Sequence, residues 1–222
     1  MTEELSILRD ITTRLEAAGI DYMLTGSVAL ACHAQPLMTS DIDLVVAFYL
    51  KDVTRITEAL GELWEMRNVA LKPYPCCHFN HAFADAALAL RAKHGLRPED
   101  IKHITVKIHP GQVKVVCEPE AAKKVPANSY DAQFSVHYAV ASCLLHGRFT
   151  LDELEEDMIR DPRALALCAR TNYEEDPTLN FPRYYGGELV IETMDGRILR
   201  HREAMNRGSD GNPLSDAAVE RK

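Results

Sequence analysis

The chain has 222 residues, of which 46 % are hydrophobic and 26 % charged, and its formal net charge is −8. This size and composition are typical of a globular protein with one large domain or two small ones, and no apolar run reaches the roughly eighteen residues that predict a membrane span. The acidic balance excludes a general electrostatic attraction to nucleic acid or to an anionic membrane. Six cysteines without a CxxC pair or a signal peptide indicate reduced thiols, so we expect a cytoplasmic protein.

The first predicted elements occupy residues 1–62, which carry four Lys/Arg against ten Asp/Glu. Hydrophobic residues at helical spacing predict a helix that begins near Glu3 and stops at Gly19. The segments "IDYMLTG" and "DIDLVVAF" then predict two short strands, with a helix of small residues between them that begins at Ser27. A further helix is expected over residues 53–60.

A Gly-Ser pair and two aspartates accompany these strands. Asp41 and Asp43 are one residue apart, so their carboxylates point the same way on an extended chain and suit a divalent cation that carries phosphates. Residues 22–46 resemble the core of the minimal nucleotidyltransferases, the polymerase-β-like superfamily. The resemblance implies that Gly26 and Ser27 hold the triphosphate of an NTP at a helix N-terminus, and that Asp41 and Asp43 bind Mg²⁺.

The same stretch departs from the nucleotidyltransferase pattern in two places. Leu37 and Met38 stand where a basic residue usually precedes the aspartates, and no strand with a third carboxylate follows the helix at 53–60. We therefore expect no nucleotidyl transfer. An ordinary turn and helix cap, followed by two solvated aspartates, is the alternative interpretation.

From about Leu63 the chain changes character. "KPYPCCHFNH" predicts a loop that leads into the helix "AFADAALALRAKHG", and "DIKHITVKIHP" and "QVKVVCEP" alternate like two paired strands. "FSVHYAVASCLLHG" predicts a buried helix ending at Gly147, and Thr150 with Glu153 has the spacing of a capping box. "ELVIETMDGRILRHR" predicts a hairpin with a type I′ turn at Asp195-Gly196, and the tail predicts a loop and the start of a helix.

This second part resembles the C-terminal domain of the MmgE/PrpD family, which contains lyases and isomerases of the 2-methylcitrate dehydratase type. The similar motifs occur in order, in "KPYPCCHFNHAFADAALALRAKHGLRPEDIKHITVKI", "CEPEAAKKVPANSYDAQFSVHYAVASCLLHGRFTLDEL" and "DGNPLS". The resemblance implies a small α+β domain that joins a large helical domain. It also implies that a small polycarboxylate binds between the two domains and that no cofactor is required.

Three candidate catalytic residues, Lys72, His78 and His81, lie within ten residues of one another. An ammonium group, imidazoles that titrate near neutrality and the N–H groups of a helix N-terminus suit a di- or tricarboxylate. The resemblance implies that Lys72 faces the active site and that His81 is a histidine of the family motif. Cys77 stands where the decarboxylase branch has a catalytic histidine, which argues against decarboxylation.

Other interpretations of these residues stay open. The cysteines and histidines of "CCHFNH" could bind zinc, although their spacing is not the usual C-x₂₋₄-C. Lys72 could be a solvated loop residue. His137 and His146 fit core or cap positions in a buried helix, and Cys143 fits a small apolar filler.

We expect an α+β protein of two segments. Residues 1–62 are a truncated nucleotidyltransferase-like α/β fragment. Residues 63–222 are an MmgE/PrpD C-terminal-type domain of a lyase or isomerase lineage that acts on small polycarboxylates, and we expect it to be weakly active or inactive as a single chain. We expect neither active site to be complete in a single chain, so the expected protein partner is either a second copy of the chain in a homodimer or another chain that supplies the helical domain. Alternatives are a nucleotidyltransferase-type protein of the toxin–antitoxin kind and an inactive fusion remnant. Neither a membrane nor nucleic acid is an expected partner.

Overall fold

The computed structural model of the chain describes residues 3–17, 22–25, 43–46 and 70–220. The chain divides into two compact units, residues 1–67 and residues 68–222. The boundary expected after residue 62 lies outside the described residues. Each unit is considered by itself.

In unit 1 the described residues form one helix and one pair of strands. Helix α1 covers Glu3–Ala17, and strands β1 (Tyr22–Thr25) and β2 (Asp43–Val46) pair antiparallel with Thr25 opposite Asp43. The expected first helix and both expected strands are therefore present. The helices expected from Ser27 and over 53–60 lie outside the described residues.

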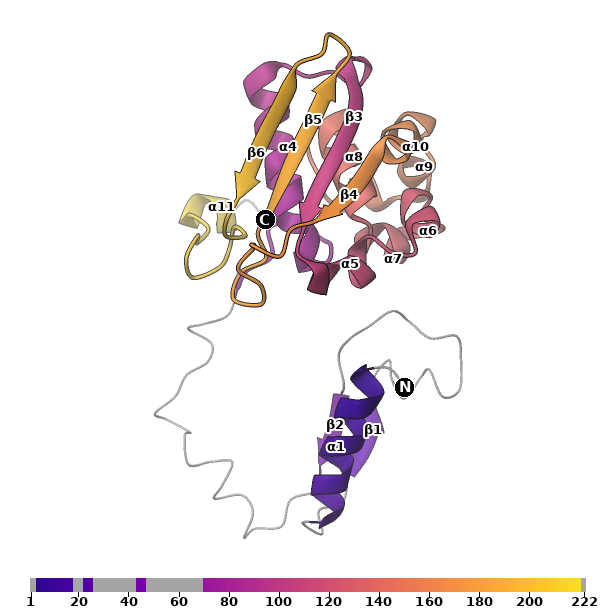
Figure 1. Cartoon of the computed structure of the whole chain (residues 1–222), viewed down its shortest axis with the longest axis vertical. Helices are drawn as coiled ribbons and strands as arrows, with labels where there is room; N and C mark the ends of the chain where they lie inside the picture. Colours follow the sequence, from indigo (N-terminus) through magenta and orange to yellow (C-terminus); the bar gives the residue numbers. More distant parts are fainter. Residues whose placement is uncertain (1–2, 18–21, 26–42, 47–69, 221–222) are drawn as a thin grey trace. The chain divides into compact units, whose positions relative to one another are not determined.

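The centre of unit 2 is a four-stranded mixed sheet, in the order β4-β3-β5-β6 (Figure 1). Its strands are β3 (Ile101–Ile108), β4 (Thr171–Glu175), β5 (Gly187–Thr193) and β6 (Ile198–Glu203). Strand β4 runs parallel to β3, whereas β5 runs antiparallel to both β3 and β6. The pairing of β3 with β5 shifts between Ile101 and His103, so Lys102 forms a bulge.

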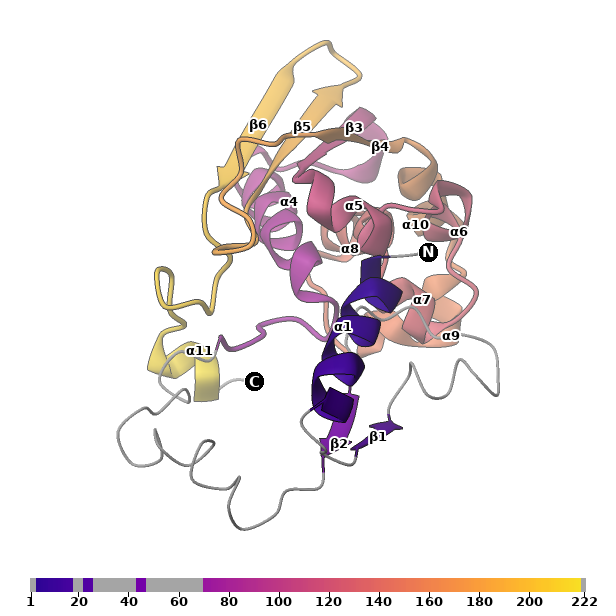
Figure 2. The ribbon, with the colours of Figure 1, turned by 60° about the horizontal axis from the view of Figure 1, so that its bottom comes forward.

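Helices α4 to α10 lie on one side of this sheet, whereas α11 lies away from it, as the turned view shows (Figure 2). The helices are α4 (His81–His94), α5 (Pro110–Val116), α6 (Glu120–Lys124), α7 (Ser129–Gln133), α8 (Val136–His146), α9 (Glu156–Ile159), α10 (Pro162–Ala169) and α11 (Asp216–Glu220), with 3₁₀ turns η2 (His78–Asn80), η3 (Pro98–Asp100) and η4 (Asp152–Leu154). The predicted α+β class is confirmed. Within the described part of the chain, no helix is both long and apolar enough to cross a membrane.

The core lies between the sheet and helices α4 and α8. Alternate residues of the strands are buried on the helical side, and α8 is buried over almost its whole length. Gly187 lets β5 approach α4 closely, since a Cβ there would lie 2.3 Å from the ring of Phe83. Gly95 and Gly147 end α4 and α8 in the left-handed conformation that glycine adopts without strain.

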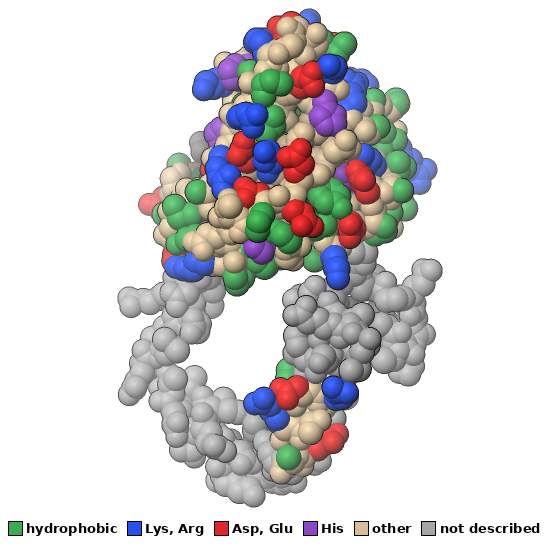
Figure 3. All heavy atoms as spheres, in the orientation of Figure 1, with side chains coloured by type: hydrophobic (Ala, Val, Ile, Leu, Met, Phe, Trp, Pro, Cys, Tyr) green, Lys and Arg blue, Asp and Glu red, His purple; other side chains and the backbone are tan. Residues whose placement is uncertain are grey.

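The opposite face of the sheet carries side chains of both charges next to one another (Figure 3). The Lys102 ammonium lies 2.6 Å from the Glu192 carboxylate, and the Arg202 guanidinium lies 3.0 Å from that of Asp176. These pairs cross from strand to strand or from strand to loop, so this face is a solvated, charge-balanced surface.

The segment "QVKVVCEP" is a helix, so the prediction of a strand there is wrong. Pro110 occupies the first helical turn of α5, and His109 caps it, because its Nδ1 accepts a hydrogen bond from the Gly111 N–H at 3.0 Å. Val113 and Val116, three residues apart, are both buried. The alternation of valine and lysine matched a period of two, but Pro110 and the burial at helical spacing decide the structure.

The hairpin β5–β6 is present, but its predicted type I′ turn is wrong. That turn needs positive φ at both central residues, and among the described residues only glycines have positive φ, Gly196 at 85° among them. The connection is longer, because the Thr193 N–H donates to the Arg197 carbonyl at 2.9 Å. The Asp195 carboxylate accepts from Arg197 Nε at 2.8 Å and holds this loop.

Thr150 and Glu153 form half of the predicted capping box. The Glu153 carboxylate accepts from both the N–H and the hydroxyl of Thr150 at 2.8 Å. The Thr150 hydroxyl oxygen accepts a hydrogen bond from the Asp152 N–H at 3.3 Å, and not from the Glu153 N–H that a capping box requires. The segment folds as the 3₁₀ turn η4 followed by α9, and not as one helix.

Candidate active site

A cleft of about 710 Å³ opens in unit 2 beside residues 71–77, which contain Lys72-Pro73 and are called the Lys-Pro loop below. This loop, the segment around η4, the loop that follows β6 and helix α11 form its walls. The lining residues are Lys72, Pro73, Tyr74, Pro75, Phe149, Thr150, Leu151, Asp152, Arg207, Leu214 and Ala218.

The loop after β6 is fixed directly onto the Lys-Pro loop. The Leu71 N–H donates to the Gly208 carbonyl at 2.9 Å. Gly208 has a φ of 91°, and a Cβ at this position would lie 1.9 Å from the Leu71 carbonyl oxygen. Only glycine allows two backbones to approach so closely in this conformation. The contact brings Arg207 and Lys72 to the same cleft.

Arg207 is oriented by two partners, Asp85 and the cleft-lining Tyr74. Its Nε donates to the Asp85 carboxylate at 3.0 Å, and its Nη2 donates to the Tyr74 hydroxyl oxygen at 2.9 Å. The Tyr74 hydroxyl in turn donates to Asp85 at 2.6 Å. Burial and the Asp85 charge raise the pKa of Tyr74, so Tyr74 keeps its proton. The network holds a guanidinium at the wall in one orientation.

The charges that line the cleft are mostly positive. Lys72 and Arg207 line it together with a single carboxylate, that of Asp152. Asp152 lies 3.1 Å from the guanidinium of Arg148, which partly compensates its charge. The Arg207 guanidinium likewise lies 2.8 Å from the Asp85 carboxylate, so the lining charges leave a small positive excess that favours an anion.

His81 is completely buried behind Tyr74. Its ring lies 5.3 Å from the Tyr74 ring and 4.5 Å from the His78 ring, measured between centroids. Its Nε2 lies 3.4 Å from the Cys76 carbonyl oxygen, and its Nδ1 has no hydrogen-bond partner. Burial, and then the neighbouring His78, lower the pKa of His81 to about 3. His81 is therefore neutral at pH 7.

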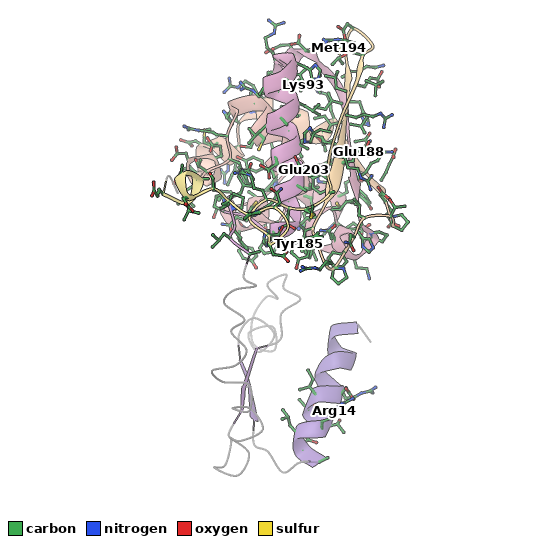
Figure 4. All side chains as sticks on the ribbon, turned by 90° about the vertical axis from the view of Figure 1, so that its left-hand side faces the viewer. Arg14, Lys93, Tyr185, Glu188, Met194 and Glu203 are labelled. Atoms are coloured by element: carbon green, nitrogen blue, oxygen red, sulfur yellow. The ribbon has the colours of Figure 1, made fainter. Side chains whose placement is uncertain are left out.

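His78 is half-buried and contacts His81, Tyr185 and Asn206. Burial, and then the Lys72 ammonium, lower the pKa of His78 to about 4. Both candidate histidines are therefore neutral imidazoles at pH 7, close to the positive charge of Lys72. Tyr185 lies toward one end of the unit, whereas Lys93 and Met194 lie toward the other (Figure 4).

The three predicted catalytic residues are neighbours, but they do not share one wall. Lys72 lines the cleft, whereas His78 and His81 do not. The ring of His81 packs against Tyr74, which is a lining residue. Arg207 was not predicted. Its partner Asp85 is 122 residues away in the chain, so no local sequence signal could have identified it.

The other residues predicted to bind nucleotide or metal, or to fill the core, are considered next. Gly26, Ser27 and Asp41 lie outside the described residues, and Asp43 belongs to β2 with no described side chain. Cys76 is buried, and burial raises the pKa of its thiol, which disfavours a zinc-binding thiolate. No three potential ligands meet as a metal site in the parts described. His137 and Cys143 are buried in α8, as expected of core residues.

The fold and the cleft define a small α+β domain with a cationic pocket beside a Lys-Pro loop. Residues 74–222 match the sequence model of the MmgE/PrpD C-terminal domain. The chain therefore belongs to the MmgE/PrpD family, and the recognition made from its motifs is confirmed. The nucleotidyltransferase resemblance of residues 22–46 lies outside this match and stays a prediction.

Similar proteins of known name support a lyase lineage. Human cis-aconitate decarboxylase is 27 % identical over 186 residues, which cover 79 % of this chain and 37 % of the human protein. The 2-methylcitrate dehydratase of Cupriavidus necator is 30 % identical over 145 residues, which cover 60 % of this chain and 29 % of that protein. The chain thus spans about a third of the length of such relatives.

Proposed function

We propose that unit 2 binds a small di- or tricarboxylate in the cleft beside Lys72, within a lyase or isomerase function of the MmgE/PrpD type. The observation that carries this proposal is the pair of cations, Lys72 and Arg207, on a cleft lined by one carboxylate. The names of the relatives, 2-methylcitrate dehydratase and cis-aconitate decarboxylase, suggest compounds of this class as ligands.

The charged lining residues bind the carboxylates of the ligand, and the apolar lining residues pack against its carbon skeleton. The exposed Lys72 ammonium is a donor for one carboxylate, and the Arg207 guanidinium, which Asp85 and Tyr74 hold in place, offers its remaining face to a second. Leu151 and Leu214 present apolar surface to the carbon skeleton. Because the cleft is open and Lys72 is exposed, we expect an affinity on the order of millimolar, about −4 kcal/mol.

The relation to catalysis rests on the neutral histidine pair. An imidazole beside a bound carboxylate can exchange protons with the ligand only from the correct protonation state. Neither histidine lines the cleft, and His78 is the candidate for such an exchange, because it is half-buried while His81 is closed off behind Tyr74.

NMR titration of the full chain with cis-aconitate, citrate and 2-methylcitrate tests the proposal, with acetate as the control for a single carboxylate. We expect shift changes to cluster on the Lys-Pro loop, on residues 149–152 and around Arg207. Acetate should produce weaker changes, because it has one charge for two cations. Small shifts spread evenly over unit 2, equal for acetate and citrate, would contradict the proposal.

A further inference from the structure

Asn206 lies beside the histidine pair in a position that no sequence motif indicated. It follows strand β6 and is 3 % exposed. Its side-chain amide has two hydrogen-bond partners. The Tyr185 N–H donates to Asn206 Oδ1 at 3.0 Å, and Asn206 Nδ2 lies 3.1 Å from His78 Nε2.

These two contacts fix the direction of the hydrogen bond to His78. A backbone N–H can only donate, so the atom of Asn206 that faces Tyr185 must be the carbonyl oxygen. The amide nitrogen then faces His78, and it can only donate as well. His78 Nε2 must therefore be the acceptor, which leaves its proton on Nδ1.

We propose that Asn206 is a positioning residue that holds His78 in the neutral tautomer with the proton on Nδ1. In this state the Nε2 lone pair is engaged by Asn206 and Nδ1 carries a proton. His78 then acts on an anion as an N–H donor and is not the base that removes a proton from the ligand. The statement about the anion rests on the proposed function, whereas the tautomer does not.

The surroundings of His78 favour the same state. Burial and the Lys72 ammonium lower the pKa of His78, and His78, Lys72 and Arg207 in turn lower that of the adjacent His81. The carbonyl of Cys76 can only accept, so His81 carries its proton on Nε2. A charged His78 would place an N–H against the N–H₂ of Asn206 and a cation near Lys72, both of which are unfavourable.

The test is to determine the tautomer of His78 by NMR of the ¹⁵N-labelled full chain, from the coupling pattern of the ring nitrogens with the ring carbon-bound protons. His78→Gln identifies the signal. In the wild type we expect one neutral ring, protonated on Nδ1, from about pH 8 down to about pH 5. A ring protonated on Nε2, or one that titrates at the ordinary value for histidine, would overturn the proposal.

Substitutions of Asn206 provide the second part of the test. Asn206→Asp keeps the acceptor for Tyr185 but offers a carboxylate to His78, so the proton should move to Nε2 and the pKa of His78 should rise by more than about one unit. Asn206→Ala removes the donor to His78 Nε2, so His78 should no longer be held in the Nδ1-protonated form. Asn212→Asp is the matched control, because Asn212 Nδ2 bonds the Met205 carbonyl in the same loop at 3.1 Å.

The control should leave His78 unchanged. If His78 in Asn206→Asp and Asn206→Ala behaves as in the wild type, Asn206 does not position it. The measurement needs no ligand, so absence of citrate binding would refute the cleft function while leaving the tautomer result intact.

Discussion

His137 is a residue whose burial makes stability depend on pH. It is 0 % exposed in α8, neither ring nitrogen has a hydrogen-bond partner, and burial lowers its pKa from 6.5 to about 4. Between these values the unfolded chain binds a proton that the folded chain does not. His137 therefore does not lower the free energy of unfolding above pH 6.5. As the pH drops from 6.5 toward 4, the free energy of unfolding falls by up to about 3 kcal/mol for a shift of this size.

Replacement of His137 by Leu should flatten part of this profile, since no buried imidazole remains to be protonated. Urea unfolding at a series of pH values measures the effect. The folded-state pKa values of His78 and His81 are lowered too, so some slope should remain in the variant. Identical slopes for wild type and His137→Leu would contradict this account of His137.

At the level of single residues, the sequence predicts which side chains belong to the site better than it predicts which of them contact one another. The Lys-Pro loop and the histidines were recognisable from their motif, and their proximity follows from their spacing. Arg207 and Asn206 could not be predicted, because each acts on a partner more than a hundred residues away, Asp85 and His78 respectively. Such pairs depend on how the loop after β6 is seated against the helices.

At the level of elements, the contact between the Lys-Pro loop and the loop after β6 depends on Gly208. Replacement by Ala adds a Cβ 1.9 Å from the Leu71 carbonyl oxygen at a φ of 91°, so we expect a loss of stability of more than about 3 kcal/mol. Gly196→Ala is the matched control. Its φ is 85°, but a Cβ there has no atom within 4 Å, so only the backbone strain of about 1–2 kcal/mol should remain.

Urea unfolding of both variants separates the steric term from the strain. Gly208→Ala should also weaken citrate binding, because the displaced loop carries Arg207. Equal losses of stability in the two variants would show that the close approach at Leu71 does not matter.

Elements with strong periodicity were predictable, and short ones were not. Helices α4 and α8 have long apolar stretches that end at Gly95 and Gly147, and β3 alternates over eight residues. Helix α5 has only seven residues, too few to separate a period of 3.6 from a period of two. Its identity comes from the cap at His109 and from tertiary burial, which the local pattern does not contain.

At the level of the whole molecule, the division into two units predicts unequal stability. Unit 2 has a continuous core between its sheet and helices α4 and α8, whereas 67 residues are few for a stable sheet-based core. Expressed alone, residues 68–222 should melt cooperatively in calorimetry, and residues 1–67 should not. A cooperative melt of the smaller fragment, or its absence in the larger one, would contradict this division.

The central claim is that unit 2 binds a small polycarboxylate through the charge of Lys72. Calorimetric titration of the full chain with citrate at pH 7 and low salt tests it, with Lys72→Ala and Lys93→Ala as a matched pair. Lys93 is an exposed lysine in the last turn of α4, toward the end of the unit away from Tyr185 (Figure 4). We expect millimolar binding by the wild type and by Lys93→Ala, and a loss of about fivefold, roughly 1 kcal/mol, in Lys72→Ala. Equal affinities in the two variants, or no binding by the wild type, would contradict the claim.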